Sequence, residues 1–297
     1  MKYILFRKSL LLSLGLSLAA IVSQVAQATI VQFESASDLA DFNQLTAADG
    51  VSVDFIHSAT AGTGGSGGLE HTATLPEDTT AVYSPASFDL TTGVMHTVSI
   101  DFKTGTVTGG SFSGSANAVA MVGFSANNNT GFYSNSADAF IGGRLRHRSS
   151  SGGADGLQTQ TKIAGGSPAS SPADGSLADI TFASDNWYRL GLSVTRDATP
   201  NQFSYSMTLE DIGPTGTSAP ASLTNGALNG TFLNADLYSD TTAYAAFRGV
   251  PNVVGSNVAF DNFTVSPAIP EPAGAVLIGI GLLGMLTRRA AAQTRGH

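Results

Sequence analysis

Residues 187–196 read WYRLGLSVTR, and residues 202–210 read QFSYSMTLE. Every second residue of each segment is apolar: Tyr, Leu, Leu and Val in the first, and Phe, Tyr, Met and Leu in the second. A period of two places alternate side chains on opposite faces of an extended chain, so each segment predicts a strand with one buried face. Residues 199–202, TPNQ, have the composition of a tight turn. Together these segments predict a β-hairpin.

The same alternation recurs along the chain. In residues 94–103, VMHTVSIDFK, the Val, Ile and Phe residues share one face with His96, whereas Asp101 and Lys103 lie on the other. Further strands are expected at 51–57, 117–125, 138–148, 243–249 and 257–265. Many short strands without a long helical pattern predict an all-β fold, an antiparallel β-sandwich of about 10 to 14 strands. A jelly roll is the favoured form, with its first and last strands paired.

Three segments interrupt the strand pattern. Residues 35–45, SASDLADFNQL, predict a short amphipathic helix with Ser37 as its N-cap and Phe42 on its apolar face. Residues 58–68 and 149–178 are rich in Gly, Ser and Thr and predict mobile loops that bury little surface. We place both loops inside one domain, because strands on both sides are needed to complete the sheets.

The composition of the 297-residue chain excludes several classes of site. There are no cysteines, so disulfides, thiolate zinc sites, iron–sulfur clusters and cysteine nucleophiles are excluded. The chain has 14 Lys and Arg residues against 22 Asp and Glu residues, a formal net charge of −8. This acidic balance argues against binding to nucleic acid. It also disfavours anionic polysaccharide or lipid unless a divalent cation bridges the two.

The first 28 residues have the three parts of a secretory signal peptide. Basic residues open the chain, residues 10–22 form an uncharged apolar run, and Ala26 and Ala28 supply the small-x-small pattern for signal peptidase. The apolar run is too short for a membrane span, which needs about 20 residues. The sequence therefore predicts export through Sec-type machinery, with Thr29 as the first mature residue.

Residues 267–297 form a second distinct segment. Its three parts in order are Pro270-Glu271-Pro272, an apolar run at 273–286, and the pair Arg288 and Arg289. Proline and a carboxylate suit the first turn of a helix. At 1.5 Å per residue the run spans about 21 Å, less than the bilayer core, so we expect transient membrane association through 273–286. The arginines should stay cytoplasmic; an ordinary C-terminal anchor is the alternative.

These three parts in this order resemble the PEP-CTERM protein-sorting signal. The resemblance covers about the last 28 residues and implies recognition by exosortase, a membrane transpeptidase-like enzyme, with cleavage near the Pro-Glu-Pro motif. It also implies a Gram-negative-type bacterium and delivery to the cell surface or matrix in an exopolysaccharide context. Unlike many members, this chain continues past the arginines. We expect a signal peptide at 1–28, a β-sandwich domain at 29–266 and a sorting signal at 267–297.

No residue pattern points to a catalytic centre. The histidines lack the spacing of a zinc site: His57, His71, His96, His147 and His297. Glu70-His71 is the one acidic–histidine neighbour pair, and a solvated pair at the border of a loop is the favoured interpretation. Asp101 stands alone on its strand, and Glu210-Asp211 point to opposite faces, so the carboxylate pair of a glycosidase is not expected. We expect no enzyme activity, no cofactor and no metal.

Glycan binding is harder to exclude. Sugars stack on exposed aromatic rings, and the candidates are Trp187, Tyr133, Phe132 and Tyr238. Trp187 lies on the opposite face of its strand from the core residues. It is either exposed to a ligand or, in the favoured interpretation, covers the edge of the core at the strand end.

The last expected strand, NVAFDNFTV at 257–265, resembles the closing strand of concanavalin A-like and carbohydrate-binding jelly-roll domains. Some of those domains use an acidic residue there for a structural calcium, and Asp261 is the match. One carboxylate does not make a site for an ion that takes about six to eight oxygens, so we expect Asp261 to cap a turn or bond backbone. The sequence thus predicts an exosortase-sorted structural or adhesive protein. A glycan-binding module is the alternative, and a glycoside hydrolase is less favoured.

Overall fold

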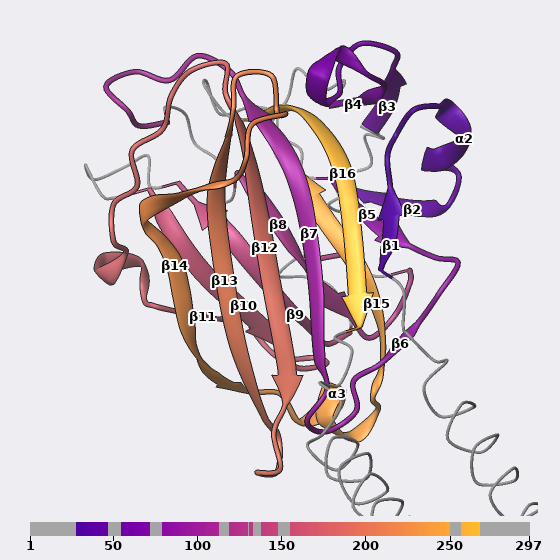
Figure 1. Ribbon diagram of the computed structural model, residues 1–297. Coiled ribbons are helices and arrows are strands. Elements are labelled where there is room, and N and C mark those ends of the chain that lie inside the picture. The colour runs from indigo at the N-terminus through magenta and orange to yellow at the C-terminus, as the bar shows by residue number, and fades with distance from the viewer. Residues whose placement is uncertain are drawn as a thin grey trace, which may run out of the picture. The chain divides into compact units, whose positions relative to one another are not determined.

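Two antiparallel sheets lie face to face (Figure 1), which confirms the β-sandwich expected from the sequence. The computed structural model describes residues 28–46, 55–71, 79–112, 119–129, 131–132, 138–147, 155–249 and 257–267. Residues Ala28–Pro267 form one compact unit. The signal-peptide run, the Pro-Glu-Pro motif, the expected helix at 273–286 and the arginines after it lie outside the described residues.

Sheet I contains the strands with the clearest alternation. In spatial order its strands are β14 (Ala221–Leu233), β13 (Gln202–Gly213), β12 (Trp187–Arg196), β7 (Met95–Thr104), β16 (Asn257–Pro267), β4 (Gly68–His71) and β3 (Phe55–Ser58), and β1 (Thr29–Val31) pairs with β16. The predicted hairpin is confirmed, because β12 pairs with β13 and the chain turns at Asn201, whose φ is +64°.

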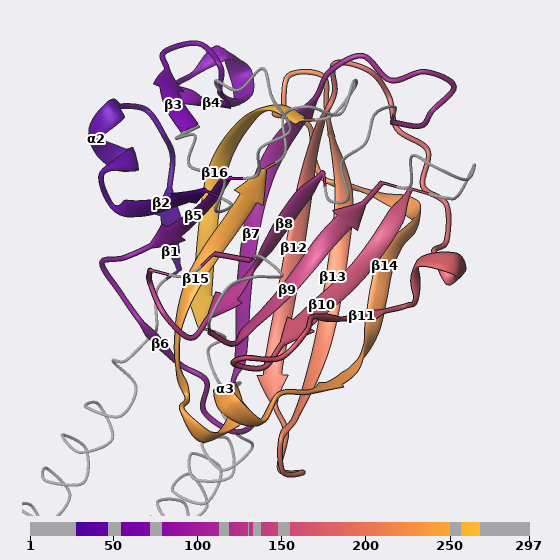
Figure 2. The same ribbon diagram turned by 180° about the vertical axis from the view of Figure 1, so that it is seen from behind.

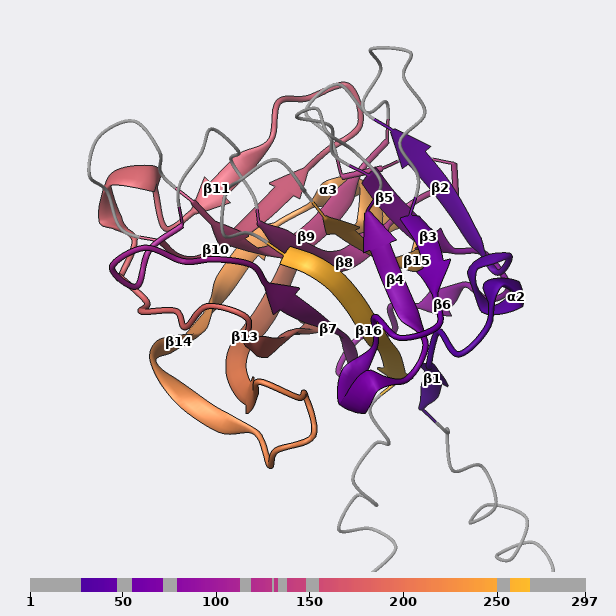
Figure 3. The same ribbon diagram turned by 90° about the horizontal axis from the view of Figure 1, so that it is seen from above.

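Sheet II forms the other layer, which faces the viewer in Figure 2 and is separated from sheet I in the view from above in Figure 3. In spatial order its strands are β11 (Ala169–Ser171), β10 (Gly156–Lys162), β9 (Phe140–Arg146), β8 (Ala120–Ser125), β15 (Thr242–Gly249), β5 (Thr79–Tyr83) and β2 (Phe42–Thr46), and β6 (Phe88–Asp89) pairs with β15. The strand expected at 117–125 is confirmed as β8, which is buried in the centre of the sheet.

The helices of the described part are short: α2 (Ala36–Leu39), α3 (Ala235–Ser239) and the 3₁₀ turns η1 (Thr63–Gly65) and η2 (Asp174–Ser176). None of them has the length and apolarity that a membrane crossing requires. The helix predicted at 35–45 is wrong beyond its first turn. The N-cap is Ser35 rather than Ser37, and the backbone N–H of Ser35 donates to the Asp38 side chain. The chain becomes strand β2 at Phe42, because burying that ring between the sheets outweighs the helical pattern.

Aromatic rings fill the core at the end of the sandwich where the N-terminal strands lie. The ring of Phe247, on β15, contacts five other phenylalanines from both sheets: Phe33, Phe42, Phe55, Phe260 and Phe263. All of these side chains are buried. This cluster joins segments from both ends of the unit, so the N-terminal strands depend on the last strand for their packing.

The long loop predicted at 149–178 is wrong over much of its length, because it includes strands β10 and β11. Leu157 reaches the core, and Gln158 is buried with its side-chain oxygen accepting from the Nε of Arg144 at 2.8 Å. Small and polar residues can form an inner strand where their hydrogen bonds are satisfied. Composition alone therefore does not reveal this strand.

The loop predicted at 58–68 is also more ordered than expected. It contains η1, and its Gly62 and Gly67 are buried. A Cβ atom on Gly67 would lie 2.5 Å from the carbonyl oxygen of Phe33, so only glycine permits this close approach.

The first and last strands of the unit pair, as the jelly-roll hypothesis predicted. Thr29 lies opposite Val265, and Val31 lies opposite Phe263. The 16 strands of the described part exceed the 10 to 14 expected, because short edge strands such as β6 and the irregular β14 carry no alternation. The chain therefore enters this unit beside the strand by which it leaves.

Candidate functional site

One row of side chains crosses the outer face of sheet I, the face turned away from sheet II. Glu70 on β4 lies opposite Ala259 on β16, Ala259 lies opposite Lys103 on β7, and Lys103 lies opposite Trp187 on β12. Directly opposed residues point to the same face, and neighbouring strands are about 4.8 Å apart. The small Ala259 thus leaves a hollow between two charged side chains. We call this row the first rung.

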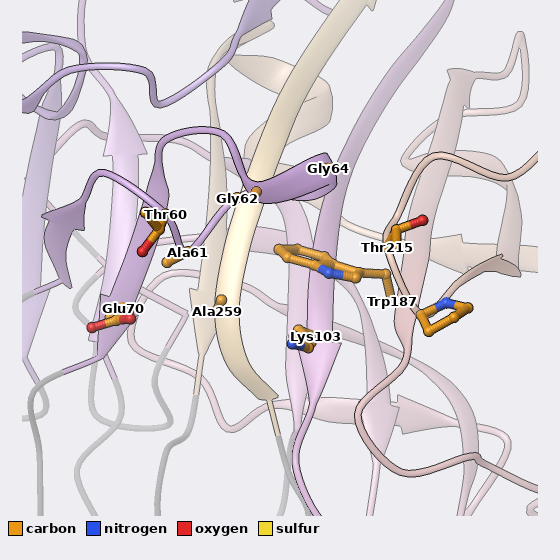
Figure 4. A pocket seen from close by; sticks show the side chains of 11 residues that line it. Thr60, Ala61, Gly62, Gly64, Glu70, Lys103, Trp187, Thr215 and Ala259 are labelled. Carbon is orange, nitrogen blue, oxygen red and sulfur yellow. The ribbon is translucent and has the colours of Figure 1, made fainter.

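The first rung forms the floor of a pocket of about 440 Å³ (Figure 4). The lining residues are Thr60, Ala61, Gly62, Gly64, Gly65, Glu70, Lys103, Trp187, Pro214, Thr215 and Ala259. One wall comes from the loop that contains η1 and the other from the turn after β13. The two walls are joined, because the backbone N–H of Gly64 donates to the carbonyl oxygen of Thr215 at 2.6 Å.

Trp187 closes the pocket at one end rather than offering a flat surface to solvent. Only 2% of the residue is exposed, and its ring packs with Ile212, Ala259 and Ala61. A Cβ atom on Gly216 would lie 3.1 Å from the ring, so the turn also packs closely on it. The favoured interpretation of a tryptophan covering the strand end is confirmed, and the exposed alternative is wrong.

Lys103 and Glu70 carry the charges that line this pocket. In Figure 4 they lie on either side of Ala259. Lys103 is half-buried and Glu70 is exposed, and within the described residues neither side chain makes a hydrogen bond or ion pair. Glu70 is exposed, as expected of a solvated pair, but Glu70 and His71 belong to strand β4 rather than to a loop. Pairing with β16, which no local pattern reveals, makes this segment a strand.

A second rung of charged residues lies next to the first on the same face. Asp261 is opposite Asp101, Asp101 is opposite Arg189, and Arg189 is opposite Glu210. The Nε and Nη2 of Arg189 donate to the two carboxylate oxygens of Asp101 at 2.7 and 2.8 Å. This bidentate bond raises the pKa of Arg189 above its ordinary value. Asp101 is the one carboxylate on its own strand, but the neighbouring strands place Asp261 and Arg189 beside it.

Asp261 holds the pocket loop against the sheet. Its Oδ2 accepts from the backbone N–H and the hydroxyl of Thr63 at 2.9 and 2.8 Å, and its Oδ1 accepts from the N–H of Asn262. Burial, the largest cause, raises the pKa of Asp261, and the charge of Asp101 acts in the same direction. The expectation that Asp261 bonds backbone and a turn is confirmed. Its role is to fix the wall that carries η1.

The other aromatic candidates do not join this site. Phe132 is fully buried in a small cluster on the outer side of sheet II. Tyr238 is half-buried, with the guanidinium of Arg196 4.0 Å above its ring, and its hydroxyl donates to the carbonyl of Asp197. Tyr133 lies outside the described residues. The structure therefore does not bring the four predicted aromatic side chains together.

The described histidines lie on separate elements. His96 on β7 is buried, and desolvation lowers its pKa despite the opposing charge of Asp89. His147, after β9, bonds through its Nδ1 to the Oδ1 of Asp155 at 2.6 Å, a buried pair that sequence spacing did not indicate. Within the described ranges, no three side chains of His, Asp or Glu converge as a metal site requires.

Catalytic carboxylates would have to face the pocket. Asp101 and Asp261 are buried, hydrogen-bonded and absent from the pocket lining, and Glu70 supplies the carboxylate among the described lining residues. Hydrolysis by the usual glycosidase chemistry needs two such groups flanking the bond to be cleaved. Among the described lining residues, the pocket offers one carboxylate, that of Glu70.

This chain is similar to known proteins in its fold rather than in its sequence. No protein-family model matches the sequence, and no curated protein matches it. Among solved structures, basic winged bean lectin with Tn-antigen has a TM-score of 0.51 and 10% sequence identity, covering 82% of this chain and 99% of that one. The chain has the concanavalin A-like jelly-roll fold.

Other lectins align over similar lengths. Lectin UEA-II complexed with galactose has a TM-score of 0.48 and 9% identity, covering 82% of this chain and 99% of that chain. The lectin from Bauhinia forficata in complex with GalNAc has a TM-score of 0.43 and 10% identity, with coverage of 82% and 98%. A shared fold does not carry a function, which depends on the residues of the site.

Proposed function

We propose that this domain is a glycan-binding module and that the pocket over the first rung is its binding site. The observation that carries the proposal is the pocket itself. Its volume of about 440 Å³ lies in the range of small-ligand sites. It presents an ammonium group, a carboxylate and threonine hydroxyls, which together can donate to and accept from sugar hydroxyls. The shared fold with lectins agrees with this use but does not transfer it.

A bulky side chain at the pocket rim tests the site. Thr215 is exposed at the rim, so Thr215→Arg should fill the entrance without touching the core. A glycan array first identifies the glycans that the wild-type full-length chain binds. We expect the variant to bind these glycans at least about tenfold more weakly. Thr231→Arg, at an exposed position on β14, is the matched control and should bind normally. If no glycan binds the wild-type chain, the proposal is wrong and a structural role is the remaining function.

We further propose that the domain is exported and sorted by exosortase to the cell surface or extracellular matrix. The support is the order of basic start, apolar run and Ala26-Gln27-Ala28 at one end, and of Pro270-Glu271-Pro272, apolar run and Arg288-Arg289 at the other. An extracellular protein of this kind would meet polysaccharide where it is released.

Mass spectrometry of the protein recovered from its native cells tests the export proposal. We expect a mature N-terminus at Thr29 and a C-terminus near the Pro-Glu-Pro motif, so that the apolar run is absent. Recovery of chains that still end in Arg288, Arg289 and the residues after them would show that the segment is an ordinary anchor.

A further inference from the structure

We propose that the pocket selects a zwitterionic glycan segment, one in which a carboxylate and an unsubstituted amine are separated by about the width of one sugar ring. This inference rests on the proposed function and names its ligand class. It is carried by the two unpaired, opposite charges of the first rung, Lys103 and Glu70.

The spacing of these charges follows from the sheet. Lys103 and Glu70 lie two strands apart with Ala259 between them, so their Cα atoms are separated by about 10 Å. The two side chains do not form an ion pair across this gap. A ligand lying over Ala259 would place one end against the ammonium group and the other against the carboxylate.

Within the described residues, neither buried carboxylate near the pocket depends on Lys103 as its partner. Asp101, a buried carboxylate two residues away on the same face, already has both of its oxygens bound by Arg189. The second buried carboxylate, Asp261, is satisfied by Thr63 and Asn262. Lys103 is half-buried, so its charge would be stabilised by an anionic group that a ligand brings into the pocket.

Glu70 explains why a purely anionic glycan would not suffice. An acidic sugar that pairs with Lys103 would bring the rest of its chain toward the carboxylate of Glu70, in a protein whose net charge is already −8. Like charges at close range disfavour binding. An amine on the neighbouring sugar converts this repulsion into a second ion pair.

The probes are three soluble sugars: methyl glucuronoside, which is anionic, methyl glucosaminide, which is cationic, and a disaccharide of glucuronic acid and glucosamine with its amine free. Titration calorimetry of the full-length chain at pH 7 and low salt should show the disaccharide binding about tenfold more tightly than either monosaccharide. Acetylating the amine of the disaccharide should remove this advantage.

Charge reversal at each end gives opposite selectivities. Glu70→Lys should bind the anionic sugar better and the disaccharide about tenfold more weakly, and Lys103→Glu should favour the cationic sugar. The double variant Glu70→Lys/Lys103→Glu restores one charge of each sign and should recover disaccharide binding. Asp240→Lys, at an exposed position far along the chain, makes the same change in net charge as Glu70→Lys and should leave all three affinities unchanged.

The failures of the two proposals are distinct. If neutral sugars bind this pocket as tightly as the disaccharide, and the charge reversals change nothing, the selectivity is wrong while the pocket remains a glycan site. If Thr215→Arg leaves glycan binding intact, or no glycan binds at all, the pocket itself is not the site. Melting temperatures of every variant establish that each one is folded.

Discussion

Replacing Phe247 with alanine is expected to lower the free energy of unfolding by about 4 kcal/mol. The ring is fully buried and contacts five other phenylalanines, three of them from segments before residue 60 and two from β16. Truncation removes these ring contacts and leaves a cavity. The surrounding phenylalanine rings cannot move to fill it, because both sheets hold them in place. Urea unfolding of the full-length chain, followed by tryptophan fluorescence, measures the loss.

Leu233→Ala is the control for this prediction. Leu233 is 65% exposed at the end of β14, so its truncation should change the free energy of unfolding by less than about 0.5 kcal/mol. A Phe247→Ala variant as stable as the control would mean that the aromatic cluster does not join the two ends of the unit.

Replacing Arg189 with methionine is expected to cost about 3 kcal/mol of stability. The variant keeps most of the aliphatic stem but leaves the carboxylate of Asp101, which is 0% exposed, without its bidentate partner. Among the residues that the structure describes, the side-chain amide of Asn262 would still donate to Asp101, at 3.0 Å. The value lies at the low end of the range for broken buried pairs, because the Arg189 side chain is 37% exposed and water already solvates part of it.

A double variant separates the missing bond from the buried charge. In Arg189→Met/Asp101→Leu no unpaired carboxylate remains, so the double variant should be more stable than Arg189→Met alone. If both variants lose the same free energy, the cost comes from lost packing of the arginine stem rather than from the unpaired charge. Equilibrium urea unfolding of the three proteins decides between these causes.

Local alternation predicted the inner strands well. β7, β12 and β13 each place alternate residues in the core, so a period of two is visible along their own sequence. Strands β10 and β14 show no such alternation along their own sequence, so the sequence did not predict them. β14 lies at a sheet edge with most of its residues exposed, and β10 buries Gly, Gln and Thr residues whose hydrogen bonds come from other strands. Such strands are determined by tertiary pairing rather than by their own pattern.

The candidate site depends on tertiary pairing even more than these strands do, so local sequence predicts less of it. The side of its strand on which Trp187 lies could be read from the sequence, but its cover comes from loops more than 100 residues apart in the chain. The placement of Lys103 and Glu70 on either side of Ala259, and of Asp101 beside Asp261, depends on how β16 aligns between β7 and β4. A shift of one residue in that alignment would turn these side chains to the other face. No local sequence motif indicates this alignment of β16.

Strand β16 runs from the pocket to the end of the unit, where it pairs with β1. Ala259 lies at the pocket and Pro267 at the far end of the same strand, so about 26 Å of β16 separates the pocket from the point where the chain leaves the unit. Thr29 is held beside that exit by its pairing with Val265. Both ends of this unit therefore lie away from the pocket, at the same end of the last strand.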